Sequence, residues 1–155
     1  GASRVFAVDT NPLKLQAAAR LGAEPIDGTG DVPAALQAAG GVDVALELVG
    51  LAHLVGIAVA SLAPGGRAVA VGITAEEFGL DPYRDLVRRE TAVLGSADHL
   101  ASEVAEVLAM AGRGDIDPGA AITARVPLES EAVNGAMDRL AGFGDDIRTV
   151  IVSAG

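Results

Sequence analysis

The chain has 155 residues, of which half are hydrophobic, 3% are aromatic and none is cysteine. Its net charge of −10 and its lack of clustered Lys or Arg argue against binding to nucleic acid or to an anionic membrane surface. Without cysteine, disulfides, thiol nucleophiles and thiolate metal sites are excluded within this chain. No apolar run reaches the ~18 residues of a membrane helix, and no signal sequence opens the chain, so we expect a cytoplasmic protein.

Short apolar runs alternate along the chain with longer segments of helical periodicity. Strands are expected at residues 4–8, 25–27, 42–49, 67–71, 91–97, 122–126 and 147–152. Helices are expected at 12–21, 32–39, 51–62, 98–112 and 128–141, with a shorter one beginning at Asp81-Pro82 and a turn at Pro64-Gly65-Gly66. Strands that alternate with helices are typical of βαβ units, so the sequence predicts an α/β fold with a parallel sheet.

Three strand ends carry residues suited to a nucleotide. Asp9 ends the first strand, and its carboxylate could accept hydrogen bonds from a ribose diol, although an aspartate that only shapes the turn is the alternative. Gly50 and Gly72 each follow a later strand, where glycine lets the backbone approach a ligand or simply ends the strand. Because the carboxyl ends of parallel strands meet at one edge, these residues together predict a ligand crevice.

Residue patterns for catalysis or metal binding are missing from the sequence. His53 and His99 have no Cys, His or paired carboxylate at ligand spacing, so we expect no metal site within this chain. Tyr83 has no lysine four residues later, and the serines lack a nucleophile-elbow context. The sequence therefore predicts no catalytic residue here, but several residues that could hold a nucleotide.

The order of segments resembles that of medium-chain, zinc-dependent alcohol dehydrogenases just after their glycine-rich turn. The matching segments are GASRVFAVDTNPLKL (1–15), LGA (21–23), GVDVALELVG (41–50), LAPGGR (62–67), VG (71–72), LGS (94–96) and DIRTV (146–150). Each is weak alone, but together they follow the family's order and spacing over nearly the whole chain. The resemblance implies a Rossmann-type doubly wound parallel sheet that binds NAD.

The resemblance also implies roles for ten residues in cofactor binding. Asp9 matches the acid that holds the adenosine ribose and selects NAD over NADP, and Lys14 matches a basic residue beside that ribose. Arg148 matches a late arginine that reaches the pyrophosphate. Seven strand-end residues would line the cleft: Val49 and Gly50 on the adenosine side, Val71, Gly72 and Ile73 at the nicotinamide amide, and Gly95 and Ser96 near the nicotinamide.

Two parts of the family pattern do not occur in this chain: the glycine-rich turn with its first βα unit, and the residues that hold and surround the zinc. By resemblance, residues 1–97 form a nucleotide-binding domain that is incomplete at its N-terminus, and residues 98–155 pack toward a catalytic domain. The parent protein would be an NAD- and zinc-dependent homo-oligomeric enzyme that acts on a small alcohol or carbonyl substrate. The chain alone is expected to be inactive.

Three other functions stay open at this point. A zinc-free quinone or enoyl reductase of the same superfamily is one, although Asp9 disfavours the NADPH that such enzymes usually use. An S-adenosylmethionine methyltransferase also places an acid at a strand end and often carries a turn like that at residues 62–67. A non-catalytic nucleotide-binding module would fit the lack of catalytic residues.

The missing first βα unit has a consequence for the sheet. In the strand order 3-2-1-4-5-6, the strand at 4–8 corresponds to position 2 and the strand at 42–49 to position 4, with the absent strand between them. We therefore expect either a gap between these two strands or a sheet repaired by direct pairing or by a swapped chain.

Overall fold

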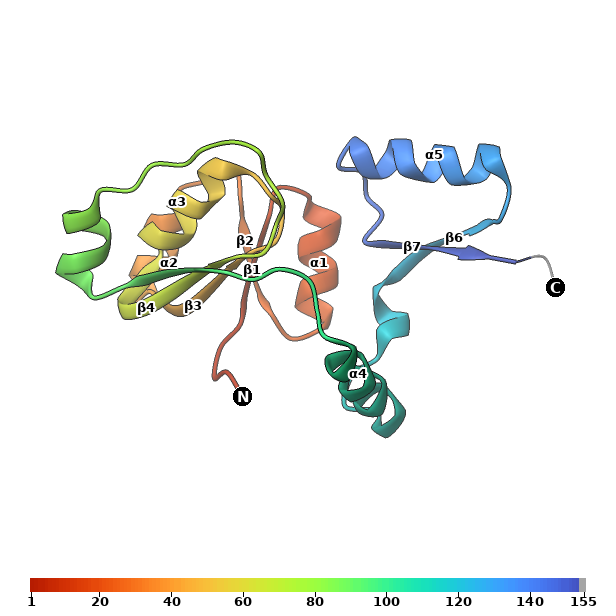
Figure 1. The fold of residues 1–155 in the computed structure, drawn as a ribbon, viewed down its shortest axis with the longest axis horizontal. Helices are drawn as coiled ribbons and strands as arrows, with labels where there is room; N and C mark the ends of the chain where they lie inside the picture. Colours follow the sequence, from red (N-terminus) through yellow and green to blue (C-terminus); the bar gives the residue numbers. More distant parts are fainter. Residues whose placement is uncertain (154–155) are drawn as a thin grey trace. The chain divides into compact units, whose positions relative to one another are not determined.

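The computed structural model describes residues 1–153, and its chain divides into two compact units, Gly1–Asp98 and His99–Gly155. Figure 1 labels the elements of both units. The α/β fold class is confirmed, because every pair of hydrogen-bonded strands is parallel and helices connect successive strands. The roles expected for residues 1–97 and 98–155 stay predictions.

The first unit begins with a βαβ element. Strands β1 (Phe6–Asp9) and β2 (Glu24–Asp27) pair in parallel, and helix α1 (Pro12–Arg20) connects them and contacts both. Asn11 caps α1, because its side-chain oxygen accepts from the Leu13 amide at 2.8 Å and Pro12 follows at the first helical position. The helix thus begins where the Asn-Pro pair predicts.

A second sheet has the order β3-β4-β5. Its strands are β3 (Val42–Glu47), β4 (Leu62–Ala70) and β5 (Ala92–Gly95), and helices α2 (Val32–Ala38) and α3 (Ala52–Ala60) precede β3 and β4 (Figure 1). The turn expected at residues 64–66 lies inside β4 as an irregularity. The pairing jumps from Val42 with Leu62 to Val44 with Arg67, so the extra residues around Gly65, at φ +76°, bulge out of the ladder.

The core of this unit lies between α3 and the second sheet. Val59, Leu62 and Ala68 are almost fully buried, and partly buried side chains such as Val42 and Val93 pack against them. Polar groups anchor the carbonyls at the end of α3. The side-chain amide of Gln37 donates to the carbonyls of Ala60 and Leu62, both at 2.8 Å.

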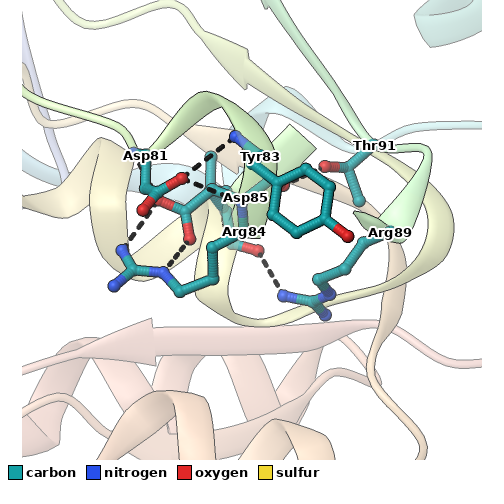
Figure 2. Close-up of polar contacts among 7 residues, drawn as sticks. Asp81, Tyr83, Arg84, Asp85, Arg89 and Thr91 are labelled. Carbon is teal, nitrogen blue, oxygen red and sulfur yellow. Dashed lines mark hydrogen bonds and ion pairs between the residues drawn. The ribbon is translucent and has the colours of Figure 1, made fainter. Parts of the chain in front are cut away.

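The segment between β4 and β5 contains a short π-helix, η1 (Pro82–Leu86), and a 3-10 turn, η2 (Val87–Arg89). Asp81 accepts from the Tyr83 and Arg84 amides at 3.0 and 2.9 Å, so the predicted start at Asp81-Pro82 is confirmed (Figure 2). The Arg89 guanidinium donates to the carbonyls of Val59 and Leu62. Together with Gln37, it donates to carbonyl groups at the end of α3 and the start of β4.

The second unit contains α4 (Ala101–Arg113), the 3-10 turn η3 (Pro118–Ala121), β6 (Ile122–Pro127), α5 (Ser130–Ala141) and β7 (Arg148–Val152). β6 and β7 pair in parallel, and α5 crosses over between them. The Ile147 amide donates to the Thr123 hydroxyl at 2.9 Å and so extends the contact beyond the ladder. The helices predicted at 98–112 and 128–141 are confirmed, because α4 and α5 begin and end within two or three residues of those bounds.

The two sheets of the first unit do not join. Among the described strands, β1 pairs only with β2, and β3 pairs only with β4. Val5 and Val8 of the β1 segment and Val44 and Leu46 of β3 are all at least 44% exposed. Of the two expected arrangements, the described chain shows the gap and not direct pairing of β1 with β3.

Candidate functional site

Asp9 occupies the carboxyl end of β1, as the sequence predicts. Its Oδ1 accepts from the Asn11 amide at 2.8 Å, and its carbonyl accepts from the Gly28 amide at 3.0 Å. The side chain is half-buried, and Lys14 lies in the first turn of the adjoining helix α1. The strand end, the helix start and the following loop therefore fix the position of the Asp9 carboxylate.

The ends of β3 and β4 meet through two glycines. A Cβ on Gly72 would lie 2.1 Å from the Gly50 amide nitrogen, and a Cβ on Gly50 would lie 2.4 Å from the Ile73 carbonyl oxygen. Gly50 also has φ +85°, a conformation that strains residues with a side chain. We call this contact between Val49–Gly50 and Val71–Ile73 the glycine junction. Only glycine fits at its centre, because any side chain would collide with backbone.

The glycine junction also has exposed side chains around it. Ile73 is 97% exposed, Val49 53% and Val71 37%. Ser96 follows β5, and its amide donates to the Ala70 carbonyl at 3.0 Å, which places Gly95 and Ser96 beside the end of β4. The structure thus brings the predicted residues of β3, β4 and β5 to one edge of the sheet.

Glu47 is a residue of this edge that the sequence analysis missed. Its side chain is buried, with 6% of the residue exposed, and its Oε1 accepts from the amides of Val49 and Gly50, both at 2.8 Å. Its main-chain carbonyl accepts from the amides of Val71 and Gly72 at 2.9 and 3.0 Å. The available signal was a carboxylate at the carboxyl end of the strand, three residues before a glycine.

Arg148 belongs to a different unit from the other candidate residues. It is the first residue of β7 and is exposed, in the unit that begins at His99. The other nine candidate residues belong to the first unit. The expected contact of Arg148 with a pyrophosphate stays a prediction.

The strongest shift of a pKa lies in η1, away from the candidate residues. The Arg84 guanidinium, with help from the Asp81 amide, lowers the pKa of the Asp85 carboxyl to about 2. Figure 2 shows the Arg84 guanidinium facing the Asp85 carboxylate. The Asp85 backbone carbonyl also accepts from the Thr91 hydroxyl. This charge network holds a loop and has no ligand-like geometry.

Within residues 1–153, no group of three or more His, Asp or Glu side chains is placed to hold a metal ion. The described residues therefore do not fit a zinc site, in agreement with the absence of cysteine. The same part of the chain includes no helix both long and apolar enough to span a bilayer.

Comparison with known proteins decides the family. Residues 1–113 match the family described as zinc-binding dehydrogenase. The chain belongs to this family. No curated protein sequence matches it.

Solved structures of dehydrogenases share the fold. The 2R,3R-butanediol dehydrogenase of Bacillus subtilis is 26% identical, with a TM-score of 0.83 over 97% of this chain and 44% of its own. The alcohol dehydrogenase of Thermus sp. ATN1 is 27% identical, with a TM-score of 0.85 over 99% of this chain and 45% of its own. A zinc-binding dehydrogenase structure from Sinorhizobium meliloti, described as bound to NADP, is 24% identical and shows the fold, with a TM-score of 0.83 over 98% of this chain and 46% of its own. The chain thus spans less than half the length of these structures.

Proposed function

We propose that this chain is the NAD-binding portion of an alcohol dehydrogenase-like enzyme that transfers hydride between an alcohol and the nicotinamide. The observation that carries the proposal is the edge at which Gly50 and Gly72 meet without side chains, next to the ends of β4 and β5. Ligands of open α/β sheets bind at this kind of edge. We call the longer protein that would contain this chain the parent enzyme.

The residues at this edge fit a nicotinamide dinucleotide. The Asp9 carboxylate, oriented by the Asn11 amide, would accept hydrogen bonds from the adenosine ribose. Lys14 would lie beside that ribose, and Arg148 would hold the pyrophosphate with its planar guanidinium. The bound cofactor supplies the hydride acceptor, while the chain binds and orients it.

The remaining candidate residues would shape the cleft through backbone. Val49 and Gly50 would line the adenosine side, and Val71, Gly72 and Ile73 would present amides and carbonyls to the carboxamide of the nicotinamide. Gly95 and Ser96, at the end of β5, would border the nicotinamide ring. The close approach of Gly50 and Gly72 supports this arrangement, because it leaves the backbone of both turns open to a ligand.

Asp9 favours NAD over NADP, because its negative charge would repel a 2′-phosphate. NADP in the Sinorhizobium meliloti structure supports the class of cofactor but not this preference. Since the described residues do not fit zinc, the zinc of the parent enzyme would take its ligands from outside these 155 residues. We further propose a cytoplasmic, homo-oligomeric parent enzyme that acts on a small alcohol or carbonyl compound.

A zinc-free quinone or enoyl reductase is the second candidate function. The absence of a metal-holding group within residues 1–153 would suit it equally well. Asp9 argues against it, because such reductases usually take NADPH. Family membership disfavours the methyltransferase alternative, since the matched family is one of dehydrogenases.

The test compares NADH and NADPH binding to the parent enzyme by fluorescence titration. Asp9→Gly should weaken NADH binding by about tenfold to a hundredfold, because a charge-assisted hydrogen bond is worth roughly 1.5–3 kcal/mol. The same change should reduce the ratio by which the enzyme prefers NADH to NADPH. Asp43→Gly, at the amino end of β3, is the matched control and should leave both affinities unchanged. Equal affinities of the unmodified enzyme for the two cofactors would contradict the NAD assignment.

Arg148→Ala provides a contrasting result in the same titration. A pyrophosphate contact is common to both cofactors, so this variant should weaken NADH and NADPH by the same factor. Asp9→Gly should instead change their ratio. Unchanged affinity for both cofactors in a folded Arg148→Ala enzyme would remove Arg148 from the site.

A further inference from the structure

A single residue, Glu47, anchors both turns of the glycine junction. Its carboxylate accepts from the amides of Val49 and Gly50, and its carbonyl accepts from the amides of Val71 and Gly72. The carbonyl contacts need no particular side chain, whereas the two carboxylate contacts require an acceptor of this length. The identity of residue 47 therefore determines the conformation of the Val49–Gly50 turn.

A carboxylate is an unusual choice for this position. Glu47 is only 6% exposed, and moving a charged group out of water is costly unless hydrogen bonds compensate it. An apolar side chain would fill a buried strand position without that cost. The two amides that the carboxylate accepts from belong to a turn in which Gly50 has φ +85°, outside the ladder of β3. The Glu47 carboxylate therefore stabilises the Val49–Gly50 turn and adds little to the packing of the core.

We propose that Glu47 is a positioning residue for the nicotinamide cofactor. It holds the Val49–Gly50 turn against Gly72 and so fixes the backbone that borders the cofactor before the cofactor binds. This inference rests on the proposed function, because that function places the cofactor at the glycine junction. When the turn is already ordered before binding, cofactor binding does not have to offset the loss of conformational entropy in the turn.

The experiment measures NADH affinity and thermal unfolding of the parent enzyme in parallel. Glu47→Ala removes both contacts and should raise the dissociation constant for NADH by about tenfold or more. Glu47→Gln keeps an oxygen of the same reach and should stay within about threefold of the unmodified enzyme. Glu47→Asp is one methylene shorter, should give an intermediate value, and carries the test if Glu47→Ala does not fold.

Val59→Ala is the control for a general loss of stability. Val59 is 1% exposed in α3, so its truncation should lower the unfolding temperature without touching the glycine junction. NADH affinity should be unchanged in this variant. If Glu47→Ala and Val59→Ala weaken NADH binding equally, or if Glu47→Ala leaves it unchanged, the positioning role is wrong while the proposed function stands. If the unmodified enzyme binds no nicotinamide nucleotide, both proposals are wrong.

Discussion

The first unit contains two regions that differ in how they are held together. The packed region, residues 32–98, contains seven buried hydrophobic side chains, among them Val59, Leu62 and Ala68. The open region, residues 1–31, is described throughout and has no buried residue. Both regions contribute to the candidate site, since Asp9 lies in the open region and the glycine junction in the packed one. The difference teaches that the position of Asp9 depends on local hydrogen bonds, whereas that of the glycine junction depends on a core.

Truncation of a leucine in each region should give the largest contrast. Leu62 is fully buried, so Leu62→Ala should lower the free energy of unfolding by about 2–5 kcal/mol. Leu21 follows α1 in the open region and is 71% exposed, so Leu21→Ala should change the free energy of unfolding by less than ~0.5 kcal/mol. Urea unfolding of the parent enzyme measures both. Equal losses for the two variants would show that the open region is buried in the intact protein.

A methyl group added to one glycine of each region sharpens the comparison. Gly72→Ala would place a Cβ 2.1 Å from the Gly50 amide nitrogen. We expect it to lower the free energy of unfolding by about 1–3 kcal/mol or more and to weaken cofactor binding. Gly28→Ala, in the open region, would place its Cβ 3.1 Å from the Asp9 carbonyl carbon, which a small shift can relieve. Gly28→Ala should therefore lower the free energy of unfolding by less than Gly72→Ala does. Gly79→Ala is the control and should leave the free energy of unfolding nearly unchanged, because nothing lies within 4 Å of its added Cβ.

The smallest effect should come from a single charged side chain of the packed region, Asp85 in η1. The pKa of Asp85 is lowered to about 2, so the folded state favours the ionised carboxylate. Its contribution to stability is therefore present above the ordinary value of 3.8 and is lost as the pH falls toward 2. Asp85→Asn should be slightly less stable than the unmodified protein at pH 7, and the difference should disappear near pH 2. A gap between Asp85→Asn and the unmodified protein that persists at pH 2 would contradict this account.

Much of the local structure follows from short-range chemistry that the sequence displays. Asn11-Pro12 and Asp81-Pro82 begin helical segments where predicted, because a capping oxygen and a proline act within three residues of each other. Asp9, Gly50 and Gly72 were identifiable as strand-end residues because each ends or directly follows an apolar run. The irregularity at residues 64–66 was predicted as a turn, but its place inside a paired strand was not, because that depends on the register with β3.

The sequence by itself determined the α/β class, the family resemblance and the strand ends at which a nucleotide could bind, since these depend on periodicity and on residues close in the chain. Only the tertiary structure decided that Arg89 satisfies the carbonyls of Val59 and Leu62, and that Glu47 holds two turns at once. The contacts of Arg89, and those of the Glu47 carbonyl with the Val71 and Gly72 amides, join segments more than twenty residues apart. Their partners are chosen by the packing of α3 and the register of β3 with β4, which no local pattern encodes.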